Sequence, residues 1–418
     1  MFRKPVFNTL VQIAGKGLTV LSGLVTTAIL IRGLGVDGYG FYILIGSSFL
    51  LLDSLADFGS KIIGVRELAA GRRKRLWVWR DIFWLRVLMT MVAFGAGLVL
   101  VMFWPGLRQV RVAAVVALLM LWPTMVAGCL EIVWQWKLKM GMKVITNVLF
   151  SGLFLGLIWV GRDKINLLSV YMWALIARGL SLVVGGRLLW RDWKFDVRKF
   201  FEVKKAKVRQ LWFDCWPMGV YLLVFTSYDR AVDSLMIDRW LGMEAVAWYG
   251  LAYKIYAVLI QPAYFFTASI FPLMTRQQSL RSSFGGQARG KSKRILIRSM
   301  GLLMVGLLVL IPTAYHLSPW VVKVLAGDGF GASVDILRIL LMALVFSYLN
   351  HLVGFGLISK GGQKQMLWLG LISLSFNFVA NWWTIPRFGI RGAAIVTVLT
   401  EGLSLGLVSA KLGRVKKA

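Results

Sequence analysis

The sequence predicts an all-α integral membrane protein with about twelve transmembrane helices in two similar halves. Hydrophobic residues make up 58% of the chain, and the mean hydropathy is +0.72. Apolar stretches long enough to cross a bilayer recur from one end of the chain to the other, since a hydrocarbon core about 30 Å thick needs about 20 apolar residues in a helix. A short sequence pattern also recurs near the middle of the chain, where a second half would begin.

The apolar stretches give the predicted membrane spans in chain order. They cover residues 10–31, 40–58, 82–104, 111–135, 144–161, 166–186, 211–238, 243–275, 296–315, 335–359, 366–385 and 391–411. The first stretch continues as a full span, so the sequence predicts no cleavable signal peptide.

The charges predict the orientation of these spans. The chain carries 49 Lys and Arg, 18 Asp and Glu, and a formal net charge of +31. The loops on the N-terminal side of the membrane hold 34 of the basic residues, the opposite side holds 9, and the remaining six lie within spans. Basic residues concentrate in cytoplasmic loops, so we expect a multi-pass protein of the cytoplasmic (inner) membrane with both termini in the cytoplasm.

Composition also excludes several classes of function. The basic residues mark topology and attract anionic lipid, so we expect no nucleic-acid partner. Two Cys and two His are too few for a disulfide framework or a metal cluster. The loops are short, no nucleotide-binding loop or catalytic triad is visible, and we therefore expect no enzyme activity, metal or cofactor beyond a coupling H⁺ or Na⁺.

The repeated pattern is Arg-x-Leu-Gly-apolar-acid. It occupies residues 32–37 after the first span and residues 239–244 after the seventh, an offset of 207 in a chain of 418 (239 − 32 = 207). We predict an N-terminal six-helix lobe over 1–186, a basic cytoplasmic linker over 187–210 and a C-terminal six-helix lobe over 211–418. Two six-span halves share one orientation, which places a substrate path between them.

Ionisable residues within spans are the candidate site residues, because charge at mid-membrane is costly. In the first span, Gln12 and Lys16 share one helix face. Arg178 and Lys254 lie about midway along spans six and eight, and Gln261 follows Lys254 on its face. Each of these cations is expected either to line a cavity or to form a buried ion pair.

The last two spans and span seven carry a second group of polar residues. Asp229, Arg230 and Asp233 cluster in span seven, where Arg230 is a pairing partner for the acids. Asn377 and Asn381 share a face of span eleven and serve either the cavity or interhelical hydrogen bonds. Glu401 lies near mid-depth in span twelve, and with Asp229 and Asp233 it is a candidate for coupling transport to protons or sodium.

Arg86 and Arg338 lie near span ends and are expected to be structural.

Several stretches together resemble the polysaccharide-unit flippases of the multidrug/oligosaccharidyl-lipid/polysaccharide (MOP) exporter superfamily. The order and spacing of these stretches carry the resemblance, which covers nearly the whole chain. They are residues 31–40, 56–59 and 66–67 in the first half, 229–233, 241–244 and 249–255 in the second, and Asn377, Asn381, Ile385-Pro386, Gly389, 392–394 and Glu401 near the end.

The resemblance implies two six-helix lobes around a central V-shaped cavity. It also implies flipping of oligosaccharides linked to undecaprenyl pyrophosphate, from the cytoplasmic to the outer leaflet, by alternating access. Lys16, Arg178, Arg230 and Lys254 are the cations that can hold the pyrophosphate. The implied partners are the lipid-linked oligosaccharide, the bilayer, and polymerase or assembly proteins.

Three alternatives remain open from the sequence. One is an ion-coupled multidrug or metabolite antiporter of the same superfamily, although such antiporters favour acidic cavities. Another is the flippase of the peptidoglycan precursor, which usually has two further helices. The third is a membrane glycosyltransferase or polymerase, which usually needs a sizeable external loop.

Overall fold

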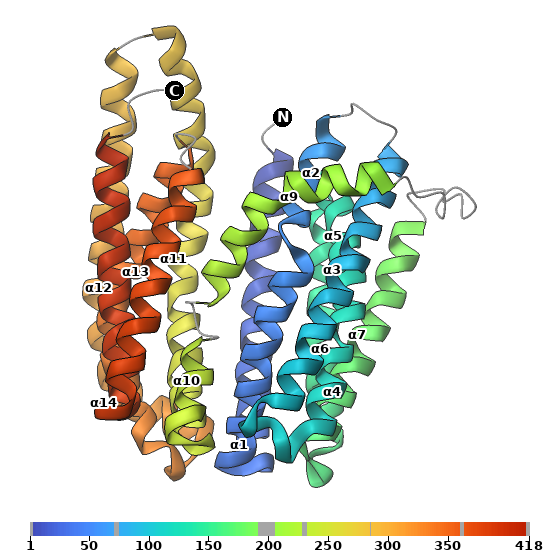
Figure 1. Ribbon diagram of the computed structural model, residues 1–418. Coiled ribbons are helices and arrows are strands. Elements are labelled where there is room, and N and C mark those ends of the chain that lie inside the picture. The colour runs from blue at the N-terminus through green and yellow to red at the C-terminus, as the bar shows by residue number, and fades with distance from the viewer. Residues whose placement is uncertain are drawn as a thin grey trace. The chain divides into compact units, whose positions relative to one another are not determined.

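The computed structural model describes residues 3–70, 75–190, 205–227, 232–284, 286–359 and 363–414, and these residues form helices joined by short turns (Figure 1). No strand occurs among them, which confirms the predicted all-α class. The chain divides into two compact units, Met1–Ala231 (unit 1) and Val232–Ala418 (unit 2).

Unit 1 contains helices that enclose one large apolar core. Its α-helices are α1 (Arg3–Asp57), α2 (Ser60–Ala70), α3 (Arg75–Phe103), α4 (Arg111–Leu119), α5 (Leu121–Trp136), α6 (Met140–Val160), α7 (Leu167–Trp190) and α9 (Lys205–Thr226). Short 3₁₀ turns, η1 (Pro105–Val110) and η2 (Arg162–Lys164), join α3 to α4 and α6 to α7. Side chains of α1, α2, α3, α5, α7 and α9 meet in the core, so α9 packs with the first unit.

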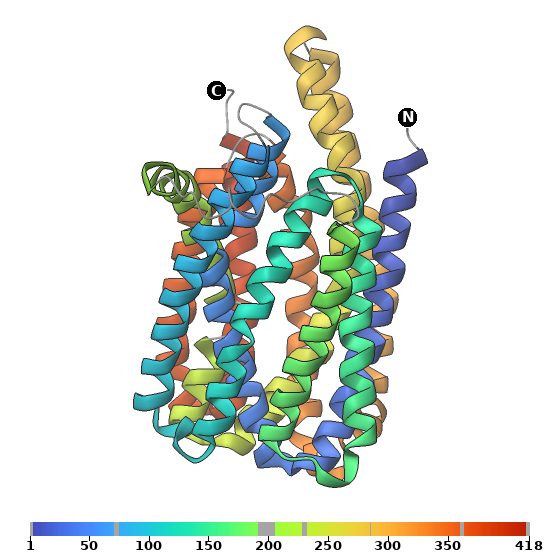
Figure 2. The same ribbon diagram turned by 90° about the vertical axis from the view of Figure 1, so that its right-hand side faces the viewer.

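Unit 2 is built on longer helices. They are α10 (Val232–Leu241), α11 (Met243–Phe284), α12 (Gly286–Ala326), α13 (Gly331–Ser359) and α14 (Gln363–Arg414), with a 3₁₀ turn η4 (Asp328–Phe330) before α13. The α13 helix packs against α11, α12 and α14. At one end of this unit α11 and α12 continue past the ends of α13 and α14 (Figures 1 and 2).

The helices agree with the predicted number of membrane crossings. Within the described residues, eight helical segments are long and apolar enough to span a membrane, and two of these, at 60 and 48 residues, are long enough for two crossings each. Both long segments contain a break: α1 leaves helical geometry at Gly35, and α14 leaves it at Gly389. Counting the two long segments as two crossings each, and adding α11 as one crossing and α9 with α10 as another, gives the twelve predicted spans.

The structure differs from the predicted elements at residues 60–70. These residues, predicted as loop, form α2, because the left-handed backbone at Phe58 and Gly59 ends α1 and starts a new helix. The predicted seventh span, 211–238, is covered by α9 and α10, and residues 228–231 between them lie outside the described residues. The α9 helix contains Pro217, which removes a helical hydrogen bond and bends the helix.

The boundaries of the predicted lobes are not tested by this fold. The helix α9, which starts the predicted C-terminal lobe 211–418, makes its described contacts with α1, α2 and α3 of unit 1. Residues 191–204 of the predicted linker lie outside the described residues. The two lobes and the V-shaped cavity between them therefore stay a prediction.

The repeated pattern has a common backbone basis. Its glycine has a left-handed φ in both copies, 72° at Gly35 and 84° at Gly242. A left-handed φ is disfavoured for residues with a Cβ and readily adopted by glycine. Each glycine ends one helical segment and begins the next, so the same turn opens the second crossing of each half.

This turn gives a prediction for stability. Replacing Gly35 with Ala should lower the free energy of unfolding by about 1–2 kcal/mol, because Ala pays for the left-handed φ. No atom lies within 4 Å of the added Cβ, so crowding does not contribute. The measurement is denaturant unfolding in detergent. The control, Gly46→Ala in the regular part of α1 with equally open space, should be neutral or stabilising by about 0.5–1 kcal/mol.

Candidate functional site

A buried polar network around Asp233 is the most developed functional candidate in unit 2. Asp233 lies in the first turn of α10 and is 1% exposed. Its Oδ2 accepts a hydrogen bond from the Tyr249 hydroxyl at 2.7 Å, and its Oδ1 accepts one from Asn381 Nδ2 at 2.8 Å. Tyr249 lies on α11 and Asn381 on α14, so the carboxylate joins three helices.

The network continues along α14. The second hydrogen of Asn381 Nδ2 goes to Asn377 Oδ1 at 3.2 Å, and Asn377 Nδ2 donates to Thr400 Oγ1 at 3.4 Å. Thr400 donates its own hydrogen to the carbonyl of Val396, which leaves its oxygen free to accept. The two halves of α14, on either side of the break at Gly389, are thus joined by side-chain hydrogen bonds.

One buried oxygen of this network accepts no hydrogen bond. Asn381 is 0% exposed, and its Oδ1 has no hydrogen-bond partner. A buried acceptor without a partner costs about 1–3 kcal/mol. Such a group needs an explanation, for example an ion or a water. The buried Thr397 Oγ1, 3.1 Å from the Tyr249 hydroxyl, adds a further oxygen.

Glu401, the other predicted coupling residue within the described chain, makes separate bonds. Asn350 on α13 donates through Nδ2 to Glu401 Oε2 at 2.6 Å and to the Glu401 carbonyl at 2.9 Å. Glu401 directly follows Thr400 in the sequence, and Thr400 belongs to the Asp233 network. Asp229 and Arg230 lie outside the described residues.

The predicted cavity cations have different surroundings. Lys16 is exposed on α1 and Gln12 is half-buried one turn before it, as the shared face predicts. Lys254 is half-buried on α11, while Gln261 donates its amide to the Ala257 carbonyl of its own helix. Only Lys16 among these is on an open surface of the chain.

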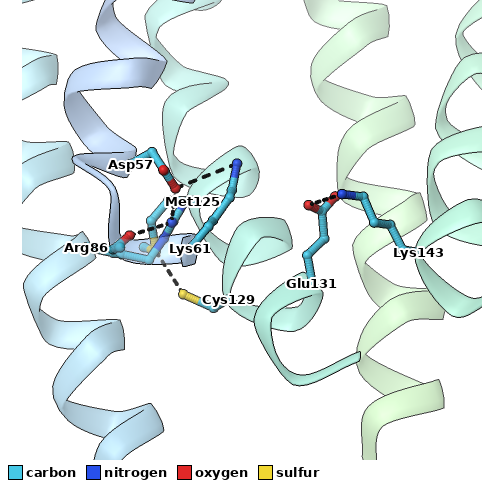
Figure 3. Close-up of polar contacts among 8 residues, drawn as sticks. Asp57, Lys61, Arg86, Met125, Cys129, Glu131 and Lys143 are labelled. Carbon is cyan, nitrogen blue, oxygen red and sulfur yellow. Dashed lines mark hydrogen bonds and ion pairs between the residues drawn. The ribbon is translucent and has the colours of Figure 1, made fainter. Parts of the chain in front are cut away.

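Arg178 lies among charges of unit 1. Its guanidinium carbon is 5.0 Å from the centre of the Phe150 ring, and the carboxylates of Glu131 and Asp53 attract it. Glu131 also pairs with Lys143 at 3.2 Å (Figure 3). Because Arg178 contacts the Phe150 ring while Glu131 pairs with Lys143, the choice between a cavity role and a buried ion pair for Arg178 stays a prediction.

A second buried cluster in unit 1 was not predicted from the sequence. Arg86 on α3 is 0% exposed and its Nη1 donates to Asp57 Oδ1 at 2.5 Å and to Ser60 Oγ at 2.8 Å. Lys61 lies 3.7 Å from the same Asp57 oxygen (Figure 3). Arg86 therefore holds residues on both sides of the break between α1 and α2.

The residues missed by the sequence analysis are those recognised only through a distant partner. Tyr249 shares the offset of 207 with Tyr42 (249 − 42 = 207), and Asp233 takes the place of Thr26 (233 − 26 = 207). That offset could have pointed to Tyr249 as a partner of Asp233, which the sequence analysis had named. Among the described residues, no group of three or more His, Cys, Asp or Glu is placed to hold a metal ion.

Comparisons with known structures show which class of protein has this fold. The lipid II flippase MurJ, inward closed, matches 98% of this chain and 87% of its own with a TM-score of 0.75 at 10% identity. An inward-facing multidrug resistance MATE transporter of the MOP superfamily matches 98% and 99% with a TM-score of 0.73 at 13% identity. A MOP superfamily transporter from Pyrococcus furiosus matches 99% and 96% with a TM-score of 0.66 at 15% identity. The chain has the MOP transporter fold.

Sequence comparison gives the family. Residues 6–278 match the model of the polysaccharide biosynthesis protein family, and the chain belongs to that family. It is a multi-pass membrane protein by its apolar helices, and its fold neighbours are transporters and flippases. An uncharacterised membrane protein of Methanocaldococcus jannaschii is 22% identical over 271 residues, which cover 61% of this chain and 49% of that protein. The alignment thus spans about half the length of that relative.

Proposed function

We propose that this protein flips a lipid-linked oligosaccharide, carried on undecaprenyl pyrophosphate, from the cytoplasmic to the outer leaflet by alternating access. The match to the polysaccharide biosynthesis family carries the proposal. The fold that the chain shares with a lipid II flippase agrees with a lipid-linked substrate. The bilayer and the lipid-linked glycan are then its partners, and polymerase or assembly proteins would receive the product.

The proposed orientation places both termini in the cytoplasm and the protein in the cytoplasmic (inner) membrane. The unequal division of basic residues, 34 against 9, supports it. In this orientation α2 and the start of α9 lie at the cytoplasmic end of unit 1.

The head group needs cations and hydrogen-bond donors to replace the water around its phosphates. Lys16, which is exposed, and Lys254, which is half-buried, are the described residues best suited to this role. Arg230 remains a candidate by sequence. Because Asn377 and Asn381 are hydrogen-bonded to each other and Asn381 also donates to Asp233, we assign these two to ion coupling. Arg178 remains a candidate for the head group.

The proposed ion-coupling site is the Asp233 network. A carboxylate, two amide oxygens and threonine hydroxyls within one buried cluster are the kinds of oxygen ligand that a hard cation takes. The unused Asn381 Oδ1 supplies a position for such a ligand bond. A proton on Asp233 is the alternative to Na⁺ at the same place, and Glu401 beside Thr400 is a second acid for the ion's path.

The proposal is tested by translocation in liposomes. A fluorescent undecaprenyl-pyrophosphate oligosaccharide is reconstituted with the protein, and the fraction reachable by an external, impermeant reagent is followed with time. Lys16→Ala and Lys254→Ala should each slow flipping about 10-fold, since a hydrogen bond to a charged group contributes about 1.5–3 kcal/mol. Lys164→Ala, an exposed cation of the opposite loop, should flip at the wild-type rate.

The outcomes separate the function from the site. Wild-type flipping that survives both substitutions keeps the function and rejects the two lysines as the head-group site. Failure to flip several different glycans, together with H⁺- or Na⁺-driven efflux of cationic dyes, would replace the flippase by the multidrug antiporter.

A further inference from the structure

The first half of α9, residues 205–216, differs from the membrane-crossing helices. It runs across the end of unit 1 beside α2, and the helix then bends and turns away (Figure 1). Pro217 marks the bend. Twelve helical residues cover about 18 Å, so this half is long enough to lie along the membrane surface.

One face of this half-helix fixes it to unit 1. Leu211 and Cys215 are buried in the core of that unit. Trp212 stacks on Phe58 with ring centres 6.2 Å apart. Phe58 also fills the space over Gly219, where an added Cβ would meet its ring. The half-helix is therefore anchored to the break between α1 and α2 and has a defined orientation.

The side of the half-helix away from this anchor carries exposed aromatic rings next to Arg209, and Lys207 lies at its far edge, on the opposite side of the helix from Trp216. Lys207 and Arg209 are exposed, and Phe213 and Trp216 are 57% and 49% exposed. The Arg209 guanidinium carbon lies 5.8 Å from the centre of the Phe213 ring. Asp214 is the acid on this face.

Such a face suits the boundary between lipid tails and head groups. Aromatic rings favour that depth, and Lys and Arg extend from it toward lipid phosphates. The surface thus complements a negatively charged membrane and not merely an apolar one.

We propose that residues 205–216 of α9 form a binding surface for the phosphate head groups of anionic phospholipids. Arg209, beside Phe213, holds one phosphate, and Lys207 at the far edge of the helix holds another. Phe213 and Trp216 lie against the upper part of the acyl chains. The inference goes beyond the proposed flipping, and it depends on the proposed orientation only for naming the cytoplasmic leaflet.

Photo-crosslinking in vesicles tests this surface. A benzophenone amino acid replaces Phe213 in the full chain, reconstituted with phosphatidylcholine and tritium-labelled phosphatidylglycerol, or with the label on phosphatidylcholine. We expect several-fold more crosslinking to phosphatidylglycerol at equal lipid fractions. Lys207→Gln with Arg209→Gln should remove that preference, because each basic residue near an anionic surface contributes about 1 kcal/mol.

A matched site serves as the control. Arg162 lies 5.3 Å from the Trp159 ring at the opposite end of unit 1, so Arg162→Gln removes a similar cation and should leave the preference at residue 213 unchanged. Equal crosslinking to both lipids, or a preference that survives the loss of both cations, would overturn the proposal. Crosslinking mainly to a second copy of the chain would also overturn it. Flipping is not measured, so the result is independent of the transport proposal.

Discussion

Replacing Asp233 with Asn is expected to abolish the acceleration of flipping by an ion gradient, with at least a 10-fold loss of the gradient-driven rate. Asn carries no negative charge for Na⁺ and takes up no proton. Its amide would also bring hydrogen atoms against the donors Tyr249 and Asn381, which now serve the carboxylate at 2.7 and 2.8 Å. The measurement is the liposome assay with and without imposed H⁺ or Na⁺ gradients, which also shows which ion drives transport.

The matched control is Asp328→Asn. Asp328 belongs to unit 2 but is 87% exposed in its side chain and pairs with Lys323 at 3.1 Å. This variant should respond to the gradient as the wild type does. If Asp233→Asn, folded and inserted normally, keeps the wild-type response, the network is a structural contact between helices and the coupling ion binds elsewhere.

Removing the Arg86 side chain is expected to cause the largest loss of stability in unit 1. Arg86→Met leaves buried Asp57 with only the partly exposed Lys61 at 3.7 Å, and breaking one partner of a buried pair costs about 3–5 kcal/mol. The substitution also removes the hydrogen bonds that link the end of α1 to the start of α2, because Arg86 contacts both Asp57 and Ser60. Denaturant unfolding in detergent, followed by tryptophan fluorescence, measures the effect.

Two further variants identify the cause. Arg86→Met combined with Asp57→Leu should recover most of the stability, since apolar replacement of a whole buried pair is often neutral or stabilising. Arg66→Met removes a cation paired with Glu67 at 3.4 Å on the exposed side of α2 and should cost no more than about 1 kcal/mol. An Arg86→Met variant as stable as the wild type would contradict this account.

The membrane spans were predictable because they depend on local sequence. Apolar length alone indicates a crossing, and a left-handed Gly such as Gly35 ends a helix wherever it occurs. The helix α2 was not predictable in this way. It is 11 residues long and contains Lys61, Arg66 and Glu67, so neither its length nor its hydropathy separates it from a loop.

The candidate site was predictable only in part, for a similar reason. Spacing placed Asn377 and Asn381 on one face of a span and marked Asp233 as an acid within the membrane. Their common network depends on contacts across 148 residues, which no local pattern contains. Arg86 shows the same limit: its depth suggested a side chain reaching the interface, whereas its actual partner is 29 residues away.

The repeat also bears on the proposed ion coupling. The two halves share the glycine turn, but Thr26 stands in the first half where Asp233 stands in the second. Under the proposed coupling, one acid at this position would bind one ion per cycle there rather than two. A single monovalent cation crossing the whole field would supply about 2.3 kcal/mol for each 100 mV. Any larger accumulation of the cargo would have to come from a concentration gradient or from its consumption in the outer leaflet.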